Sequence, residues 1–576
     1  MEMHGVREMQ ERPSTQVRRR WSRARRARDP RFDGRFFVGV TSTGIYCRPI
    51  CPAPSAKEEN VLYFSSAAAA AAAGLRPCRR CRPEAAPGTP AWAGTSATVS
   101  RALRLIDHGA LDDDGSVGRL ASRLGVGSRQ LRRLFERHLG ASPVAVAQLR
   151  RLQFARRLID ETEIPLIDVA FAAGFGSVRR FNAAFRSSFG CAPRDFRRQR
   201  VEESSWTATG DGAGWRLRLD YRPPFDWERL LEFLAPRALP RIEAVAGGVY
   251  RRAFRLEELE GWLEVRPGRR RSSLDLILHC RRAPVSRSER CDRDPPGDGA
   301  LGGERLPALL PLVQRCRSLF DLDSDPAAVA ERFADDQELA SRLVQAPGIR
   351  VPGAWDPFEI AVRAVLGQQV TVRGATTLAG RLIERWGERL SPGGESGAGS
   401  SLDRVFPAAD RLVDAPLEQI GLPRARAEAL RALARGVAEG EIVLDGSAPS
   451  DEVCAAMCRV RGLGDWTAQY VAMRALADPD AFPASDLHLR RALPATETMR
   501  GLSAKTLEKR AEAWRPWRAY AAMLLWQTEP APPGSSTMRP TIRPTMRPKM
   551  RPKMRPEATP APTPRRRAGR QKGAAR

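Results

Sequence analysis

The chain has 576 residues and a formal net charge of +28, with 95 Lys and Arg residues against 67 Asp and Glu. That length is too great for a single hydrophobic core and predicts about three or four domains. The excess positive charge favours a polyanionic partner, most often nucleic acid, and the lack of any run of about 18 apolar residues excludes a membrane-spanning helix.

The first segment, residues 1–30, is polar, rich in arginine and without a hydrophobic period, so we expect a disordered basic arm. It lacks the apolar core of a secretory signal peptide, which predicts a cytoplasmic protein whose thiols stay reduced. A disulfide between the neighbouring Cys47 and Cys51 is therefore disfavoured.

Four cysteines occur next as two close pairs, Cys47 with Cys51 and Cys78 with Cys81. The pattern is C-x3-C, 26 intervening residues and C-x2-C. Two such pairs brought together by a fold form a tetrahedral thiolate site that suits zinc. A purely structural zinc and a reactive one both fit this spacing.

The residues around these cysteines, FFVGVTSTGIYCRPICP (36–52) and LRPCRRCRP (75–83), resemble the N-terminal zinc domain of the Ada methyltransferases. The resemblance implies a zinc domain over 31–94 in which Cys47 is both a ligand and the nucleophile that takes a methyl group from a DNA phosphotriester. It implies that the other zinc ligands are Cys51, Cys78 and Cys81.

Zinc chemistry makes that role plausible, because zinc keeps a thiol deprotonated at neutral pH. Methylation of one thiolate would remove a negative charge, so the domain would be less repelled by DNA phosphates. The methyl group could then act as an electrostatic switch.

Between about 100 and 200 the apolar residues recur with a helical period, and two helix-turn-helix units are predicted. Their turns contain glycine at 125–127 and 174–176, and Ser128 and Ser177 are the expected N-caps of the second helices. An ordinary helical bundle with a solvated basic face is the alternative. The expected DNA-reading side chains are Arg129, Arg132, Arg133, Arg179 and Arg180.

The signatures A-x-x-x-G-F (170–175) and G-x-x-P-x-x-F-R (190–197) favour the first interpretation, because together with the two units they resemble the AraC-type DNA-binding domain. The resemblance implies an all-α domain over 95–202 that binds promoter DNA.

Short alternating runs from 215 to 280 indicate strands, and the chain is again helical from 355 to 530. The Gly-, Pro- and Ser-rich stretches 281–304 and 391–401 are expected to be surface loops. Gly462-Leu-Gly464, between two helical runs, predicts a tight hairpin whose backbone N–H groups can bind a phosphate.

This hairpin is followed, 22 residues after Gly464, by Asp486, an arrangement that resembles the helix-hairpin-helix DNA glycosylases. DPFEIAVRAVLGQQVTV (356–372) and WRPWRAYAAMLLWQTE (514–529) extend the resemblance to the AlkA-type glycosylases. It implies a small α+β domain over 212–345 and an all-α glycosylase domain over 346–530.

The implied activity is that of a DNA-3-methyladenine glycosylase II, which hydrolyses the N-glycosidic bond of alkylated purines. Asp486 would be the essential carboxylate, opposing the positive charge that develops on the sugar. The alternative is that Asp486 only caps the helix that follows it.

Other roles are carried over with the resemblance. Gln369 would be the wedge that fills the gap left by the flipped base, and the implied base-pocket aromatics are Trp466, Tyr470 and Trp526. Trp466 stands where bifunctional relatives have a lysine, so no Schiff base is expected.

The remaining cysteines are not expected to bind metal. No cysteine follows Cys458, which excludes the iron–sulfur cluster of some relatives. Cys454 and Cys458 are expected to pack in the core.

The last segment, 531–576, repeats Met-Arg-Pro and is predicted to be an extended cationic tail, because proline at this spacing is incompatible with a helix or a sheet.

The whole chain is thus predicted to be a multidomain α+β protein that repairs alkylated DNA and activates a transcriptional response to it. Double-stranded DNA, alkylated or promoter, is the expected partner, with RNA polymerase as a candidate and no membrane. A methyl-activated transcription factor whose glycosylase half only binds DNA is the main alternative, and a general basic chromatin-like protein is a weaker one. The expected location is the bacterial cytoplasm, at the nucleoid.

Overall fold

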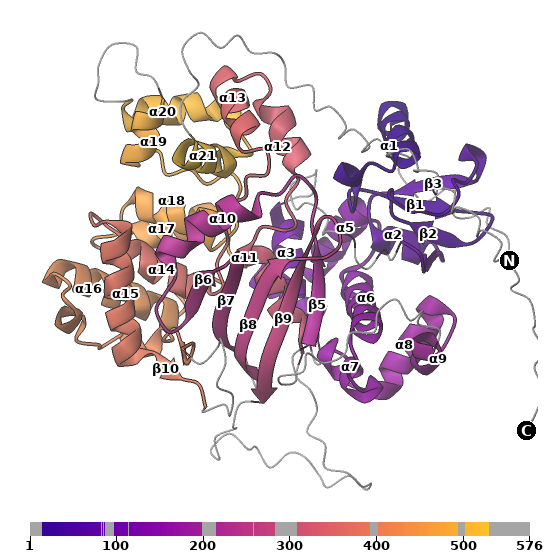
Figure 1. Ribbon diagram of the computed structural model, residues 1–576, viewed down its shortest axis with the longest axis horizontal. Coiled ribbons are helices and arrows are strands. Elements are labelled where there is room, and N and C mark those ends of the chain that lie inside the picture. Colours follow the sequence, from indigo (N-terminus) through magenta and orange to yellow (C-terminus); the bar gives the residue numbers. More distant parts are fainter. Residues whose placement is uncertain are drawn as a thin grey trace, which may run out of the picture. The chain divides into compact units, whose positions relative to one another are not determined.

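The computed structural model describes residues 14–81, 83, 86, 97–112, 115–198, 215–256, 259–282, 308–391, 401–493 and 502–528, with the side chains of 280–282 excepted. The domains follow one another as the sequence predicts, and the multidomain α+β class is confirmed (Figure 1). The predicted loop at 281–304 starts two residues too early, because 281 and 282 are the last residues of a strand. Its remainder, 283–304, most of the predicted loop at 391–401 and the tail at 531–576 lie outside the described residues. Among the described residues, no helix is long and apolar enough to cross a membrane.

The expected disordered arm is wrong for its second half, because helix α1 (Thr15–Ala27) forms there. Its inner side stacks the Trp21 ring on Phe36, with centroids 4.9 Å apart and planes 11° from parallel. The Arg25 guanidinium is buried against Glu58, at 2.6 Å, and also donates to the Tyr63 hydroxyl. A buried arginine in the inner face is the reason that no apolar period is visible in the sequence.

A four-stranded sheet forms the centre of this first domain, in the order β3-β1-β2-β4. The strands are β1 (Phe37–Val40), β2 (Ile45–Cys47), β3 (Val61–Phe64) and β4 (Arg76–Pro77). The short helix α2 (Ala67–Ala72) packs on the same domain, with Ala69 and Ala70 beside Phe37 and Tyr46 in one buried cluster. Strand β2 pairs in parallel with β4, with Tyr46 opposite Pro77.

The second domain is all-helical, as predicted, and contains two helix-turn-helix units. Its helices are α3 (Ala97–Asp107), α4 (Val117–Arg123), α5 (Ser128–Leu139), α6 (Pro143–Glu161), α7 (Leu166–Ala172), α8 (Val178–Phe189) and α9 (Pro193–Arg198). Gly125 and Gly174 in the two turns have φ of +68° and +81°, a conformation that favours glycine.

The two second helices begin differently. Ser177 is the N-cap of α8 as predicted, and its side chain accepts a hydrogen bond from the Arg180 N–H at 3.2 Å. The predicted cap at Ser128 is wrong, because Gly127 occupies the cap position and Ser128 is already the first residue of α5. Glycine in extended conformation is an acceptable N-cap, so the helix starts one residue earlier.

The third domain contains an antiparallel five-stranded sheet in the order β5-β9-β8-β7-β6, whose strands lie side by side in Figure 1. Its strands are β5 (Trp215–Asp220), β6 (Glu243–Ala246), β7 (Val249–Leu256), β8 (Leu259–Pro267) and β9 (Ser273–Arg282). The helices between this sheet and the next domain are α10 (Trp227–Leu234), α11 (Leu310–Leu319), α12 (Pro326–Phe333) and α13 (Gln337–Gln345), of which α13 packs against the C-terminal helix α21 (Arg518–Gln527).

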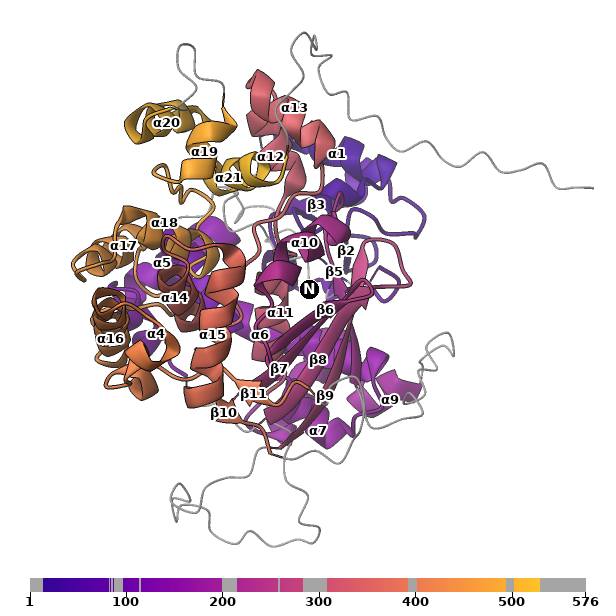
Figure 2. The same cartoon turned by 60° about the vertical axis from the view of Figure 1, so that its left-hand side comes forward.

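The fourth domain is helical and supplies the hairpin region. Figure 2 shows helices α14 to α18 gathered in one group. The bounds are α14 (Pro357–Leu366), α15 (Val372–Trp386), α16 (Arg424–Ala438), α17 (Ser450–Cys458), α18 (Asp465–Arg474), α19 (Leu487–Ala492), α20 (Ala504–Ala511) and α21 (Arg518–Gln527). Two residue pairs, Glu388–Val405 and Arg389–Arg404, form the small ladder β10 (Glu388–Arg389) and β11 (Arg404–Val405).

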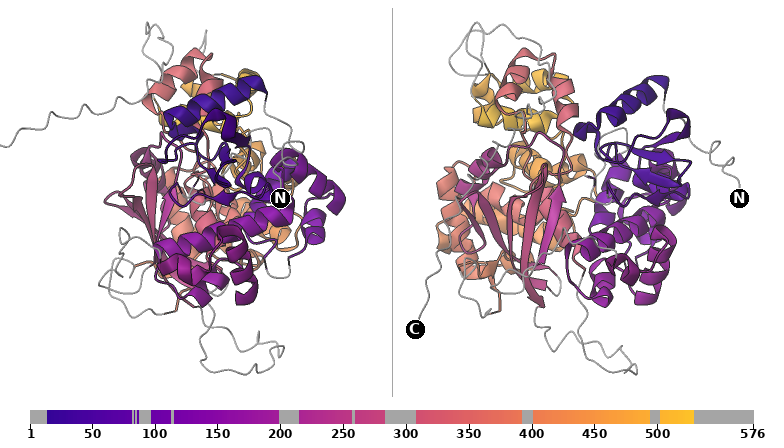
Figure 3. Two further views of the ribbon diagram at one scale, coloured as in Figure 1. Left: turned by 90° about the vertical axis from the view of Figure 1, so that its right-hand side faces the viewer. Right: turned by 45° about the vertical axis from the view of Figure 1, so that its right-hand side comes forward.

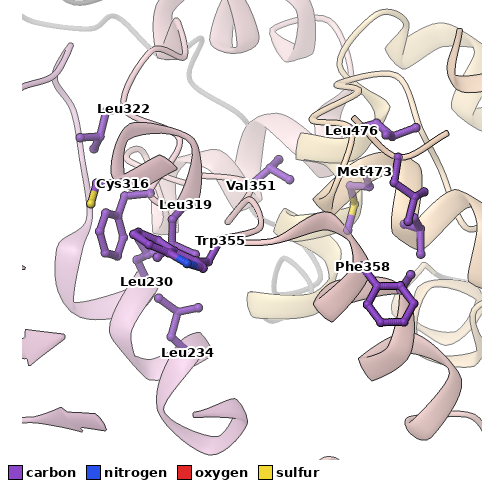
Figure 4. Close-up of a cluster of buried hydrophobic side chains, with 14 of the residues drawn as sticks. Leu230, Leu234, Cys316, Leu319, Leu322, Val351, Trp355, Phe358, Met473 and Leu476 are labelled. Carbon is purple, nitrogen blue, oxygen red and sulfur yellow. The ribbon is translucent and has the colours of Figure 1, made fainter. Parts of the chain in front are cut away.

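One continuous buried cluster joins the sheet domain to these helices. In Figure 4, Leu230 and Leu234 of α10 lie beside Leu319 of α11 and Trp355, while Met473 of α18 lies farther along the same cluster. This apolar packing fixes α18 and α21, the two helices that carry the aromatic residues of the candidate site.

Candidate functional site

Asp486 immediately precedes α19 and caps it. One carboxylate oxygen, Oδ1, accepts the backbone N–H of His488 at 2.9 Å and that of Leu489 at 3.0 Å. Asp486 is therefore a helix cap, as the alternative interpretation expected, because a carboxylate is a good partner for the free N–H groups at a helix start.

The same carboxylate also accepts two indole N–H groups. Trp466 Nε1, from α18, donates to Asp486 Oδ2 at 2.9 Å, and Trp526 Nε1, from α21, donates to Oδ1 at 3.1 Å. A helix cap does not require two tryptophan donors from other helices. The tertiary structure thus holds this carboxylate at the meeting point of three helices, where its orientation is fixed from both sides.

The three aromatic residues predicted for the base pocket lie together around Asp486. The rings of Trp466 and Tyr470 are stacked, with centroids 5.3 Å apart and planes 11° from parallel. The Tyr470 and Trp526 rings are 6.4 Å apart and tilted by 55°. All three residues are half-buried, so this group of rings is partly accessible from outside.

The Tyr470 hydroxyl has cationic neighbours that the sequence did not reveal. Arg474 lies one turn further along α18, is 3% exposed, and donates from Nη1 to the Tyr470 oxygen at 2.7 Å. Burial by itself raises the pKa of Tyr470, but the positive charges of Arg474 and Arg237 outweigh it and the pKa is lowered overall. The i, i+4 spacing of Tyr470 and Arg474 was the available signal.

The hairpin contains Gly462 with φ of +95°, where a Cβ would come 2.9 Å from the Cβ of Ala429. Both the conformation and the close approach require glycine. Gly464 is the N-cap residue of α18 in extended conformation, with open space around it. The hairpin therefore presents the start of α18, where backbone N–H groups are free to bind an anion.

The turn between α14 and α15 lies against this hairpin. Gln368 was missed by the sequence analysis; its Nε2 donates to the Gly462 carbonyl at 3.1 Å and to the Thr467 hydroxyl at 3.0 Å. The next residue, the predicted wedge Gln369, is exposed and has φ of +56°. Val370 and Val372 are also unusually exposed, at 39% and 40%. The turn and the first residue of α15 thus offer one polar and two apolar exposed side chains near the hairpin.

The four predicted metal-ligating cysteines are brought together by the first sheet. Cys47 ends β2, and because β2 and β4 are parallel, the Cys78 N–H donates to the Tyr46 carbonyl at 2.9 Å. The turn after β2 returns Cys51, whose N–H donates to the Arg48 carbonyl at 3.1 Å. Cys81 follows Cys78 on the turn after β4.

Their sulfur atoms all lie within 4.8 Å of one another, and the Cys51 and Cys78 Sγ atoms are 3.9 Å apart. Four sulfurs at about 2.3 Å from a tetrahedral zinc are separated by about 3.8 Å, so the cluster fits that metal. Hydrogen bonding with the Cys47 thiol lowers the pKa of Cys51 to about 7.

The four sulfurs differ in burial. Cys78 and Cys81 are buried, whereas Cys47 and Cys51 are half-buried. The Arg48 backbone N–H donates a hydrogen bond to Cys81 Sγ at 3.3 Å. The two half-buried sulfurs, of Cys47 and Cys51, are the more accessible ones for a reaction with DNA.

The predicted DNA-reading arginines lie on the surfaces of their helices. Arg129, Arg132 and Arg133 are exposed on α5, and Arg179 and Arg180 are exposed on α8. The expectation that Cys454 and Cys458 both pack in the core is wrong for Cys458, which is exposed at the end of α17; Cys454 is half-buried. A spacing of four residues places both on one side of a helix, but that side turns away from the core at the helix end.

Four family models match the chain in succession. They are the metal binding domain of Ada (19–84), a helix-turn-helix domain (120–199), the AlkA N-terminal domain (216–290 and 299–356) and the HhH-GPD superfamily of base excision DNA repair proteins (362–517). The first match begins inside α1, in agreement with that helix being part of the first domain.

Curated relatives show the same composition. The chain is 39% identical over 506 residues, 88% of its own length and 95% of the other, to a "Probable bifunctional transcriptional activator/DNA repair enzyme AlkA" of Mycobacterium tuberculosis. It is 31% identical to "DNA-3-methyladenine glycosylase 2" of Escherichia coli, covering 54% of this chain and 96% of that protein. It is 32% identical to "Bifunctional transcriptional activator/DNA repair enzyme Ada" of the same organism, covering 30% of this chain and 46% of that protein.

A solved 3-methyladenine DNA-glycosylase from Archaeoglobus fulgidus superposes with a TM-score of 0.42 at 21% identity, covering 54% of this chain and 97% of that chain. The order of the matched domains and the coverage of the mycobacterial relative decide the assignment. The chain belongs to the family of bifunctional transcriptional activator/DNA repair enzymes in which an Ada metal-binding domain and a helix-turn-helix domain precede an AlkA-type DNA glycosylase.

Proposed function

We propose that the glycosylase half hydrolyses the N-glycosidic bond of alkylated purines, and that the first domain removes methyl groups from DNA phosphotriesters and reports them to the helix-turn-helix domain. The observation that carries the glycosylase proposal is the Asp486 carboxylate, held by two indole N–H groups inside an aromatic cluster.

The two oxygens of Asp486 are not equivalent. Oδ1 accepts three hydrogen bonds, from the His488 and Leu489 backbone and from Trp526, and is fully occupied. Oδ2 accepts one from Trp466 among the described residues, which leaves a lone pair available. We infer that Oδ2 faces the sugar as the bond from C1′ to the base nitrogen breaks, opposing the positive charge on the ring and then orienting the water that adds to C1′.

The leaving base is recognised by the half-buried aromatic faces. An alkylated purine is cationic, and stacking on Trp466 or Trp526 is favoured by the negative face of an indole ring. Tyr470 completes the same group of rings. A lyase would use a lysine amine to form a Schiff base with the sugar, and Trp466 stands at that position. The proposed reaction is therefore direct hydrolysis without a covalent intermediate.

In the first domain, the four cysteines would hold zinc, which when bound keeps the sulfurs as thiolates. Cys47 is the proposed nucleophile because the resemblance to the Ada zinc domain gives it that role, and because it is half-buried whereas Cys78 and Cys81 are buried. Its sulfur would form a bond to the methyl carbon as the carbon–oxygen bond breaks, and the electron pair would leave on the phosphodiester oxygen. One negative charge is then lost from the cysteine cluster, and the helix-turn-helix arginines can bind promoter DNA, with RNA polymerase as the partner there.

The experiment that tests the glycosylase proposal is release of free base from methylated duplex DNA by the purified full-length chain. We expect methylated purine to appear in solution together with abasic sites, and no strand cleavage by the protein itself. If the chain binds the DNA but leaves every base attached, the alternative of a regulator with a DNA-binding glycosylase fold is favoured instead.

We also predict one zinc ion per chain, bound by the four cysteines. Metal analysis of the purified protein should give one zinc per polypeptide, and Cys78→Ser should lose it because three thiolates cannot complete the tetrahedral site. Cys191→Ser, which changes a half-buried cysteine outside the cluster, is the matched control and should keep its zinc. Wild-type protein without zinc would contradict the assignment.

A further inference from the structure

Helix α1 has two sharply different faces. Trp21, Ala24 and Arg25 form the inner face, with Ala24 4% exposed and packed in one cluster with Phe36 and Tyr63. At 100° per residue, the direction opposite to this face is occupied by Arg19, Arg23 and Arg26, spaced i, i+4 and i+7. All three of these arginines are exposed.

These three arginines have no acidic partner in the described part of the chain. The ion pairs of α1 there are made by other residues, Arg25 with Glu58 and Arg20 with Glu331. The Arg26 guanidinium makes one neutral hydrogen bond, to the Ser22 hydroxyl at 3.3 Å. We call Arg19, Arg23 and Arg26 the α1 arginine row.

The row is unfavourable for the helix itself. Like charges at i and i+4 destabilise a helix by about 0.2–0.5 kcal/mol per pair. Arg26 lies in the last turn, where the macrodipole favours a positive charge, so the cost comes from repulsion within the row. An external anion would relieve that repulsion. The α1 arginine row thus lowers the stability of its own helix and at the same time suits a polyanion. Features that lower stability in this way are expected at binding sites.

The C-terminal end of α1 lies beside the cysteine cluster. The C-cap residue of α1, Arg28, donates from Nη2 to the carbonyls of Pro52 and Ala53, at 3.3 and 3.1 Å, in the loop directly after Cys51. Cys47 itself packs against the cluster that holds the inner face of α1. Figure 1 places α1 beside β3 and β1, and Figure 3 shows this indigo helix from two further sides.

We propose that the α1 arginine row binds the unmodified backbone phosphates that flank a methyl phosphotriester, and so delivers the neutral triester to the cysteine cluster. The inference rests on the proposed methyl-acceptor function. A methylated phosphate carries no charge, so the site that reacts with it gains nothing from that phosphate; the flanking charged phosphates must supply the electrostatic attraction. The row spans about 10 Å of helix at 1.5 Å per residue, which allows more than one phosphate to be reached by long side chains.

A nucleic acid fits this face better than a membrane surface does. An interfacial helix inserts an apolar face into the lipid. The apolar residues of α1, Trp21 and Ala24, are already used inside the domain, so the helix can offer only charge.

The test compares two full-length variants with equal loss of charge. The first is Arg19→Gln/Arg23→Gln/Arg26→Gln, and the control is Arg269→Gln/Arg270→Gln/Arg271→Gln, which changes three exposed arginines in the turn between β8 and β9. Two methyl donors are used: a duplex carrying one methyl phosphotriester, and trimethyl phosphate, which has no flanking charge.

With the duplex at about 0.1 M salt, we expect the first variant to accept methyl about tenfold more slowly or worse, and the slope of log rate against log salt to become shallower by about 2–3. With trimethyl phosphate the rate should equal wild type, because the cysteine cluster is intact. The melting temperature should not fall, because glutamine is a good helix former and the like-charge repulsion is gone. The control should behave as wild type with both donors. An unchanged rate and slope for the first variant would overturn the proposal.

A second measurement separates this proposal from the methyl-acceptor function. Arginine modification by a dicarbonyl reagent, read by mass spectrometry on the wild-type chain, should show that the phosphotriester duplex protects the α1 arginine row and not Arg269–Arg271. If wild type accepts no methyl from either donor, the methyl-acceptor function fails, and this protection pattern still decides whether the row binds DNA. Protection by anionic phospholipid vesicles but not by the duplex would overturn the proposal in favour of a membrane contact.

Discussion

Replacing Asp486 by asparagine is expected to lower the rate of alkylpurine excision by about a hundredfold to a thousandfold, while binding to the same DNA persists or tightens. Loss of one preorganised electrostatic stabiliser commonly has an effect of that size. The substitution removes the negative charge that faces the sugar and leaves the DNA-binding surfaces untouched. Removing a negative group near phosphates should not weaken the complex.

The hydrogen bonds around Asp486 predict how well the variant folds. An asparagine Oδ1 can still accept the His488 and Leu489 N–H groups and cap α19. Its amide nitrogen cannot accept the Trp466 indole N–H that now donates to Oδ2. We therefore expect a loss of unfolding free energy of about 1 kcal/mol, seen as a slightly lower melting temperature of a folded protein.

Asp414→Asn is the matched control for this measurement, because it removes the same charge from a carboxylate whose side chain is 92% exposed. It should excise base at the wild-type rate. If the Asp486 variant is folded and excises at a rate near that of wild type, the carboxylate is only a cap and the catalytic group must be sought elsewhere.

Cys47→Ala should abolish methyl uptake from phosphotriester DNA and leave base excision unchanged. The substitution removes the half-buried sulfur that is proposed as the nucleophile, and with it one of the four proposed zinc ligands. Excision is proposed to depend on Asp486, which belongs to another domain. Methyl transfer from labelled DNA and base release, measured on one preparation, check both statements.

Cys458→Ala removes an exposed thiol that is not part of the cysteine cluster and serves as the control; it should accept methyl like wild type. Peptide mapping of the methylated wild-type chain should find the methyl group on Cys47. A methyl group on Cys51, or continued uptake by the Cys47 variant, would show that the nucleophile has been assigned to the wrong sulfur.

Features that depend on a few consecutive residues could be predicted from the sequence. The pairing of Cys47 with Cys51 and of Cys78 with Cys81, the glycine turns before α5 and α8, and the Asp486 position before a helix all follow from short-range geometry. Spacing and backbone conformation act over one or two turns, so no knowledge of the rest of the chain is needed.

The tertiary structure alone decided the contacts between distant segments. Trp526, 40 residues after Asp486, donates to it because the buried core packs α21 against α19. Gln368 reaches Gly462, 94 residues away, for the same reason. The resemblance placed Trp526 in the base pocket but did not predict its hydrogen bond to Asp486.

Helix α1 shows the limit most clearly. Its arginine-rich sequence has no apolar period, because one of its inner positions is filled by Arg25, whose charge is neutralised by Glu58 on a distant turn. A sequence pattern predicts the buried face of a helix from its apolar residues. A charged residue can be buried only beside a partner of opposite charge, and that partner is brought close only when the chain folds. The sequence alone thus determined the kinds of site in this protein, and the folded chain determined which side chains meet in them.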